Sequence, residues 1–197
     1  MATLSVFDHV SVDGYFAGPR GEIDWFKAIR EDDEYSAYTK RQSQSGGTLV
    51  FGRTTYELMK SYWPTPAARS SDPDMARVVT ESPKIVFSRT LPDVKDEPNW
   101  KNVTVLRDID DADVRRRKRE SRAGLTILGS GSIVRQLAKR RLIDEYRLVL
   151  VPIVLGGGKA LFEGLQPMNL ELVDAKHFEN GLVLLTYRSA ESRPARR

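Results

Sequence analysis

The sequence contains no cysteine among its 197 residues. This absence excludes disulfide bonds, thiolate zinc sites and a cysteine nucleophile. Long hydrophobic runs are absent too, since the longest, LVLVPIVL, falls far short of the roughly 20 residues of a membrane-spanning helix. The first ten residues also lack the basic and apolar regions of a signal peptide. We therefore expect a cytoplasmic protein that has no membrane partner.

The sequence has few histidines and no complete phosphate-binding motif of the two common kinds. The two histidines, His9 and His177, are far apart and lack a carboxylate-rich spacing, so we expect no metal site. The dinucleotide fingerprint G-x-G-x-x-G fails because Val134 occupies the position of its third glycine. The P-loop motif fails in LGGGKALF, where Ile153 and Ala160 replace its first glycine and its Ser/Thr. An ordinary Rossmann or P-loop nucleotide site is therefore excluded.

The net charge of +4 is concentrated in two segments. Residues 107–122 and residues 189–197 each carry two more basic than acidic residues, so the rest of the chain is balanced. Acidic residues precede basic ones in the first segment, which favours an exposed helix whose charges complement its dipole. No aromatic residues are interleaved with the bases, so we expect no nucleic-acid partner. A basic helix that contacts an acidic protein partner stays an alternative.

Strand and helix patterns alternate along residues 1–188, which we assign to one domain, with residues 189–197 as a disordered basic tail. This alternation predicts a mostly parallel sheet, and the turn pair Asn180-Gly181 predicts a closing antiparallel hairpin. Residues 64–75 are predicted as a loop. We expect helices from Thr54 to Trp63 and at residues 107–122 and 132–142, and strands at residues 3–12, 48–51, 84–87, 103–106, 125–128, 146–155, 170–178 and 182–188.

Polar residues follow three of the predicted strands, at the edge where open α/β sheets bind ligands. Arg53 and Arg89, several hydroxyls and a helix N-terminus there describe a site for a polyphosphate. Structural roles explain each group alone, because Thr54, Ser130 or Ser132 could cap a helix and the other residues could form turns. The three groups are Gly52-Arg53-Thr54-Thr55, Ser88-Arg89-Thr90 and Gly129-Ser130-Gly131-Ser132.

Six ordered segments form a wider pattern: SVDGYFAG, FGRTTYE, FSRT, LGSGSIVRQL, IDEYRLVLVPIVLGGGKALF and the closing hairpin. Together they resemble the dihydrofolate-reductase-like family, and most of all the reductase domain of the bifunctional riboflavin-synthesis deaminase/reductase, over essentially residues 3–188. The resemblance implies a three-layer α/β fold with a mostly parallel central sheet, a C-terminal antiparallel hairpin and helices on both faces. It also implies NADPH as the cofactor.

The resemblance assigns roles to the three polar groups. Arg53 and the turn Ser88-Arg89-Thr90 would lie near the adenosine 2′-phosphate, which favours NADPH over NADH. Thr54 and Thr55 would lie at the pyrophosphate, and residues Gly129 through Ile133 would wrap it at the helix start. Gly52, at the end of the preceding strand, is also a candidate cofactor-binding residue.

Hydride transfer also needs a proton source, and the segment PRGEIDWFKAIRED contains candidate acids. By resemblance, Glu22 and Asp24 are candidate catalytic residues. Asp13, a carboxylate near an expected strand end, and Trp25, whose ring could stack on a flat heterocycle, are candidate substrate-binding residues. A solvated turn and ordinary packing of the indole ring are the alternatives.

Two residues depart from the pattern of riboflavin-pathway reductases. Those enzymes commonly carry a lysine where this chain has Phe7, and a glutamate where it has Leu128. Both changes argue against a ribosyl-phosphate pyrimidine as the substrate. The zinc motifs of the deaminase domain are also missing from the sequence.

The leading hypothesis is an NADPH-dependent reductase of a small pterin-, folate- or pyrimidine-like heterocycle. The alternative is a catalytically silent NADP(H)-binding or regulatory module of the same fold. The apolar strand at residues 146–155 and the closing hairpin would leave an open sheet edge, so we expect a homodimer through residues 145–188. A monomer in which Pro152 blunts the edge stays open.

Overall fold

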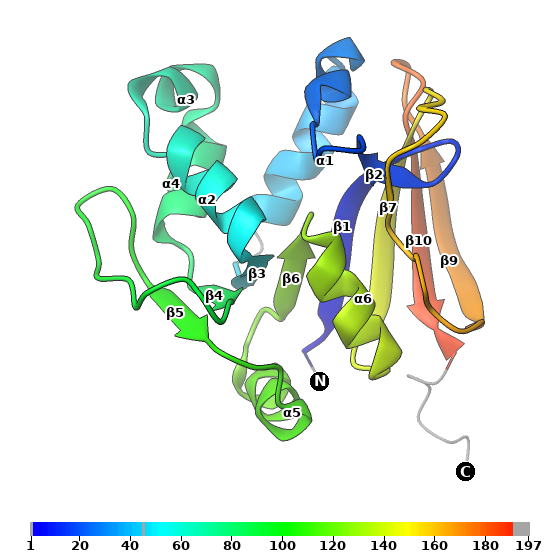
Figure 1. The fold of residues 1–197 in the computed structure, drawn as a ribbon. Helices are drawn as coiled ribbons and strands as arrows, with labels where there is room; N and C mark the ends of the chain where they lie inside the picture. The colour runs from blue at the N-terminus through cyan, green and yellow to red at the C-terminus, as the bar shows by residue number, and fades with distance from the viewer. Residues whose placement is uncertain (1, 45, 191–197) are drawn as a thin grey trace.

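An eight-stranded sheet forms the centre of the computed structural model, which describes residues 2–44 and 46–190 (Figure 1). Its strand order is β5 (Val103–Leu106), β4 (Lys84–Phe87), β3 (Thr48–Gly52), β6 (Leu125–Leu128), β1 (Leu4–Ser11), β7 (Glu145–Val151), β10 (Val183–Ser189) and β9 (Leu170–His177). The strands from β5 to β7 are parallel, whereas β10 is antiparallel to both β7 and β9.

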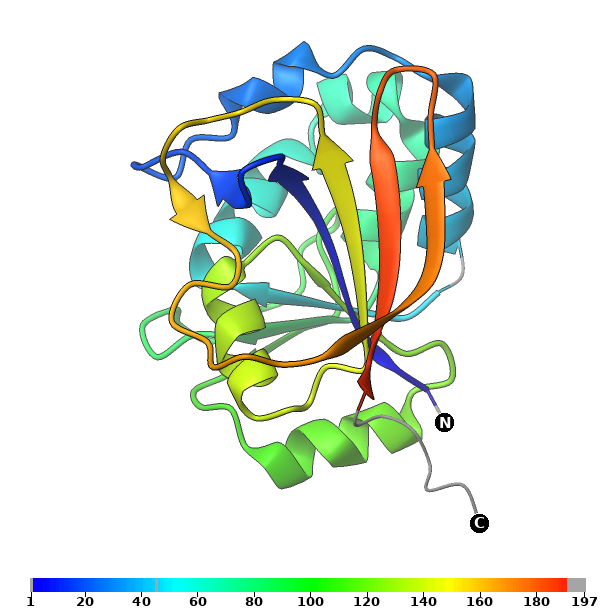
Figure 2. The ribbon, with the colours of Figure 1, turned by 90° about the vertical axis from the view of Figure 1, so that its right-hand side faces the viewer.

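Helices cover both faces of this sheet and create three layers. One face carries α1 (Asp33–Gln44), α2 (Arg53–Tyr62), α3 (Pro66–Ser71) and α4 (Pro73–Glu81), and the other carries α5 (Asp111–Glu120) and α6 (Gly131–Lys139). A small sheet of β2 (Tyr15–Ala17) and β8 (Lys159–Ala160) lies beside the end of β1, as Figure 2 shows, and a 3-10 helix spans Asp24–Ala28. The expected α/β fold with a C-terminal antiparallel hairpin is confirmed.

Strand β1 separates two parts of the core. Leu4, Val6 and Val10 belong to the buried cluster that also contains Val134 of α6. Phe7 belongs to the opposite face, where it packs with side chains of α1. Because burial of one aliphatic side chain contributes about 1.5–3 kcal/mol, this alternation fixes which residues of β1 face each layer.

The prediction of a loop at residues 64–75 is wrong, because the segment contains α3 and the start of α4. Each helix begins with a proline that follows a capping side chain. Thr65 Oγ1 accepts a hydrogen bond from a backbone N–H of α3 at 3.2 Å, and Asp72 Oδ1 does the same for α4 at 2.9 Å. A proline suits this first helical position, since its missing N–H would have no partner there.

The ends of the last strands also differ from prediction. β7 ends at Val151 instead of extending to residue 155, because Pro152 has no N–H to continue the ladder. β10 includes Ser189, which was assigned to the basic tail and whose N–H donates to the Asp144 carbonyl at 2.9 Å. Residues 191–197 of that tail lie outside the described residues.

β9 is the last strand of the sheet and belongs to the antiparallel hairpin (Figure 2). Within the described ranges, β10 is its only neighbour in the sheet. Leu172 and Val173 are 55% and 46% exposed on this strand. An exposed apolar edge of this kind pairs readily with another strand.

We predict a homodimer formed through β9. Light scattering at low micromolar concentration should give twice the chain mass of 22.3 kDa. Leu172→Lys should shift the protein to the monomer, because a charge on an edge strand opposes pairing. Val12→Lys, at an exposed valine outside β9, is the matched control and should leave the dimer intact. A wild-type mass of 22.3 kDa that does not rise on concentration would contradict the prediction.

Candidate functional site

A cavity of about 680 Å³ lies at the carboxyl ends of β1, β3 and β6. Its walls come from α1, the N-terminus of α2, α4 and the N-terminus of α6. This volume is in the range of about 300–1,000 Å³ typical of small-molecule sites. A second cavity, of about 270 Å³, lies between α4 and residues 98–101 and contains none of the predicted site residues.

Two of the three polar groups from the sequence meet in the larger cavity. The turn between β3 and α2 and the turn between β6 and α6 both line it. Ile133 is an exception among the cofactor residues, since its side chain is buried in the core beneath Gly52. The cavity-lining residues of these turns are Gly52, Arg53, Thr54, Thr55, Gly129, Ser130, Gly131 and Ser132.

Ser130 joins the two turns. Its backbone adopts a left-handed conformation with φ of 59°. Its Oγ accepts a hydrogen bond from Gly52 N at 3.0 Å and donates to the Leu128 carbonyl at 3.3 Å. The hydroxyl therefore links β3 to β6. It does not cap α6, which was the structural alternative for Ser130.

Neither α2 nor α6 has a side-chain cap at its N-terminus within the described chain. The cap considered at Thr54 does not form, because α2 begins at Arg53, whose Nε donates a hydrogen bond to Glu57 Oε1 at 2.7 Å. Uncapped N-termini offer backbone N–H donors and the positive end of the helix dipole. Two of them border one cavity, which is the arrangement expected of an anion site.

Gly131 is required by a ring packed against it. A Cβ built at this position would lie 2.4 Å from Cε1 of Phe16 on β2. The left-handed backbone belongs to the preceding residues, Gly129 with φ of 55° and Ser130, rather than to Gly131. Phe16 also lines the cavity, so this contact brings β2 against the start of α6.

The third polar group, Ser88-Arg89-Thr90, lies outside the cavity lining, but one of its residues contacts the lining residue Arg53. Ser88 Oγ accepts hydrogen bonds from the N–H groups of Thr90 and Leu91, as in an ordinary turn. Thr90 Oγ1 accepts from Arg53 Nη1 at 2.8 Å. Arg89 is exposed and pairs with Asp108 at 2.6 Å. Thr90 is therefore the member of this group that lies beside a cavity residue.

The four residues expected at the substrate do not line the cavity. Glu22 pairs with Arg20, Asp24 is exposed and pairs with Lys27, and Asp13 accepts hydrogen bonds from two backbone N–H groups before β8. Trp25 packs edge-on against Phe26 with ring centroids 4.3 Å apart. Gly21, Ile23 and Phe26 of the same segment line the cavity instead.

Sequence reasoning missed two adjacent polar residues of β1 that line the cavity, Asp8 and His9. Asp8 is 5% exposed, and its Oδ2 has no hydrogen-bond partner in the described chain. Burial raises the pKa of Asp8 from 3.8 to about 8 and lowers the pKa of His9 from 6.5 to about 4. The signal was available, since a polar pair interrupts an apolar strand that the sheet buries on both faces.

We predict that Asp8 makes the protein less stable as pH rises. The folded state holds the Asp8 proton between pH 3.8 and about 8, whereas the unfolded chain has lost it, so stability falls across this interval. His9 has the opposite effect between about pH 4 and 6.5, because only the unfolded chain protonates there. The two effects cancel below pH 6.5. Between pH 6.5 and 8, Asp8 alone lowers the free energy of unfolding by about 2 kcal/mol.

Urea unfolding of the wild type and of Asp8→Asn at several pH values measures this effect. The variant should lack the loss above pH 6.5 and should become less stable on acidification below it, because His9 then acts alone. Identical pH profiles for the two proteins would contradict the assignment.

We also predict that Ser130→Ala destabilises the protein by about 1–3 kcal/mol, because the substitution leaves the buried N–H of Gly52 without its partner. Ser132→Ala, two residues further along the same turn, should stay within about 0.5 kcal/mol of the wild type. Denaturant unfolding gives both values, and equal effects of the two substitutions would argue against the link between the turns.

The chain matches a known protein family along most of its length. The model of the RibD C-terminal domain family matches residues 2–184. The chain belongs to the RibD C-terminal domain family. Two uncharacterized Bacillus subtilis relatives are similar along most of their length. YyaP is 28% identical over 90% of both chains, and YwjB is 30% identical over 89% of this chain and 91% of its own.

Solved structures share the fold. A proposed riboflavin biosynthesis protein from Shewanella sp. PV-4 gives a TM-score of 0.72 at 23% identity, covering 95% of this chain and 98% of its own. A pyrimidine reductase-like protein from Corynebacterium diphtheriae gives 0.60 at 16% identity, covering 95% and 92%. A Thermotoga maritima diaminohydroxyphosphoribosylaminopyrimidine deaminase/5-amino-6-(5-phosphoribosylamino)uracil reductase gives 0.66 at 13%, covering 96% of this chain and 57% of its own. The dihydrofolate-reductase-like resemblance is thereby confirmed.

Two further findings concern the described residues alone. None of their helices is long and apolar enough to cross a membrane. They also contain no cluster of three or more His, Cys, Asp or Glu side chains arranged to hold a metal ion.

Proposed function

We propose that the protein is an NADPH-dependent reductase that transfers a hydride to a small heterocycle of the pterin, folate or pyrimidine kind. The observation that carries the proposal is the pair of uncapped helix N-termini, those of α2 and α6, at one cavity. Together they offer N–H donors and positive dipole ends to the two phosphates of a pyrophosphate. Membership of the RibD C-terminal domain family, and relatives named as reductases, support the reductase class.

The residues of the two turns fit a phosphorylated dinucleotide. The left-handed backbone at Gly129 and Ser130 favours close approach of an anion to the start of α6, whereas the Phe16 ring fills the space beside Gly131. Arg53 lines the cavity and can form charge-assisted hydrogen bonds to a 2′-phosphate beside Thr90. NADPH supplies the hydride when it is bound, and the role of the turns is to hold its phosphates.

The alternative is a catalytically silent NADP(H)-binding module, which would use the same turns. It draws support from the positions of Glu22 and Asp24, because neither candidate acid lines the cavity. The two functions differ in turnover. The reductase should oxidise NADPH with at least one pterin, folate or pyrimidine acceptor, whereas the module should bind NADPH and oxidise none of them.

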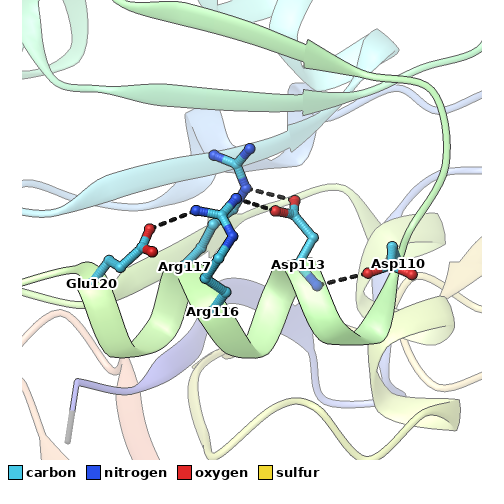
Figure 3. Close-up of polar contacts among 5 residues, drawn as sticks. All are labelled: Asp110, Asp113, Arg116, Arg117 and Glu120. Carbon is cyan, nitrogen blue, oxygen red and sulfur yellow. Dashed lines mark hydrogen bonds and ion pairs between the residues drawn. The ribbon is translucent and has the colours of Figure 1, made fainter.

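A role for the basic helix α5 in binding a partner has less support. Figure 3 shows that four of its charged side chains pair within the helix, whereas Lys118 pairs with Asp144 outside it. Asp113 binds both Arg116 and Arg117, the latter at 2.7 Å, and Glu120 binds Arg116 at 2.6 Å. Asp110 accepts the N–H of Asp113 at 2.7 Å and so caps the helix. Exposed pairs of this kind contribute roughly 0.3–0.5 kcal/mol each, as expected of a solvated helix face.

We predict that Arg53→Ala weakens NADPH binding about tenfold or more and leaves NADH binding nearly unchanged. The expected loss corresponds to a charge-assisted hydrogen bond to the 2′-phosphate, which contributes roughly 1.5–3 kcal/mol. Fluorescence titration with both cofactors measures it. Arg89→Ala is the comparison and should cost less, because Arg53 belongs to the cavity lining and Arg89 does not. Equal losses for NADPH and NADH would contradict the assignment of Arg53.

A further inference from the structure

The cavity extends beyond the two turns into a second region, which we name the acceptor half. It lies between α1 and the helices α2 and α4, over the end of β1. Its walls are mainly apolar, and they include the two positions where the resemblance implies charged residues. The apolar wall residues that carry the argument are Phe7, Leu58, Met59, Trp63, Met75 and Leu128.

One hydrogen-bonded pair of rings lies in this apolar wall. His9 Nε2 is 2.6 Å from the hydroxyl oxygen of Tyr35 on α1, and both residues line the cavity. Neighbouring rings hold the pair in place. His9 lies 5.0 Å from Phe26 and 5.7 Å from Phe7 between ring centroids, and Tyr35 lies 5.1 Å from Phe178. The pair therefore presents hydrogen-bonding atoms in a fixed orientation to whatever occupies the acceptor half.

The pair carries no charge near neutral pH. Burial lowers the pKa of His9 to about 4, so the imidazole is neutral, and burial raises the pKa of Tyr35 above its ordinary value, so the phenol keeps its proton. The groups that face His9 are the rings of Phe7, Phe26 and Tyr35. A neutral donor and acceptor suits the polar edge of an uncharged ring better than an anionic group.

The one cation of the acceptor half already has partners. Arg147 on β7 donates from Nη2 to Ser5 Oγ at 2.7 Å and from Nη1 to Gln42 Oε1, and its Nε lies 3.5 Å from Glu145 Oε1. The carboxylate offsets part of its charge, and these contacts fix the guanidinium between β1, β7 and α1. The other cations of the cavity lining belong to the start of α2, to α6 and to β8, namely Arg53, Arg135 and Lys159.

We propose that the acceptor half binds a flat, uncharged heterocycle without a phosphate group, and that the His9–Tyr35 pair hydrogen-bonds the polar edge of that ring. The apolar walls pack against the faces of the ring, and the pair selects its orientation. This inference rests on the proposed function in one respect, because it places the cofactor in the other half of the cavity. It goes beyond that function by naming the residues that recognise the substrate and by excluding phosphoribosyl compounds.

Binding of lumazine, a fluorescent and uncharged two-ring heterocycle, tests the role of the pair. Titration near neutral pH, with and without saturating NADP⁺, should show binding to the wild type. Tyr35→Phe should weaken it about tenfold, because His9 loses its partner and the ring loses a hydrogen bond. Tyr187→Phe is the control, at a tyrosine of β10 outside the cavity lining, and should bind as the wild type does. If Tyr35→Phe fails to fold, His9→Phe removes the same hydrogen bond and should weaken lumazine equally.

Riboflavin and its 5′-phosphate test the exclusion of phosphate, since the two differ in that group alone. With NADP⁺ occupying the cofactor half, the 5′-phosphate should add no affinity for the flavin. Binding of lumazine together with failure of both flavins to bind also supports the proposal. Tenfold tighter binding of the phosphorylated flavin would overturn it, as would absence of lumazine binding or an unchanged affinity in Tyr35→Phe. If NADP⁺ itself does not bind, the proposed function fails, and lumazine titration of the free protein still decides the role of the pair.

Discussion

The hydrogen bond from Gly52 N to Ser130 Oγ is the interaction on which the arrangement of the candidate site depends. It crosses from β3 to β6 and fixes the relative position of the turns that begin α2 and α6. Because Ser130 uses its hydroxyl for this link, its side chain does not cap α6. Its carbonyl accepts the N–H of Ile133 at 2.7 Å, and the N–H groups before Ile133 have no side-chain cap in the described chain. One side chain therefore holds two helix N-termini together and leaves both open to a ligand. The contact of Gly131 with Phe16 then closes the cavity wall from the side of β2.

The centre of the sheet combines this link with two unusual residues of β1. Asp8 and His9 lie in a strand that pairs on both sides, so burial perturbs both side chains. The His9 ring has a partner in Tyr35, whereas Oδ2 of Asp8 has none in the described chain. Buried polar groups of this kind reduce stability, and they are concentrated where ligands bind. The pH dependence predicted for Asp8 and the recognition proposed for His9 are consequences of the same burial.

Much of the fold was readable from local patterns, whereas the helices at residues 64–81 were not. The strands that meet at the site have apolar runs ending in glycine or serine, and their positions agree with the prediction. Residues 64–75 resemble a loop in composition, but Thr65 and Asp72 act as caps before prolines. Composition alone does not distinguish a proline that ends a structure from one that begins a helix. Sequence position alone points to Glu22 and Asp24, whereas ion pairs with Arg20 and Lys27 decide where the two carboxylates lie.

The sequence by itself determined the alternation of strands and helices, the closing hairpin and the two turns that begin α2 and α6, because each depends on residues close together in the chain. The tertiary structure alone decided which polar side chains share a cavity. Tyr35 reaches His9 across 26 residues, and Ser130 reaches Gly52 across 78, through strand pairings whose order no local pattern specifies. Local propensity fixes the elements, whereas the register and order of the sheet fix which of their side chains meet.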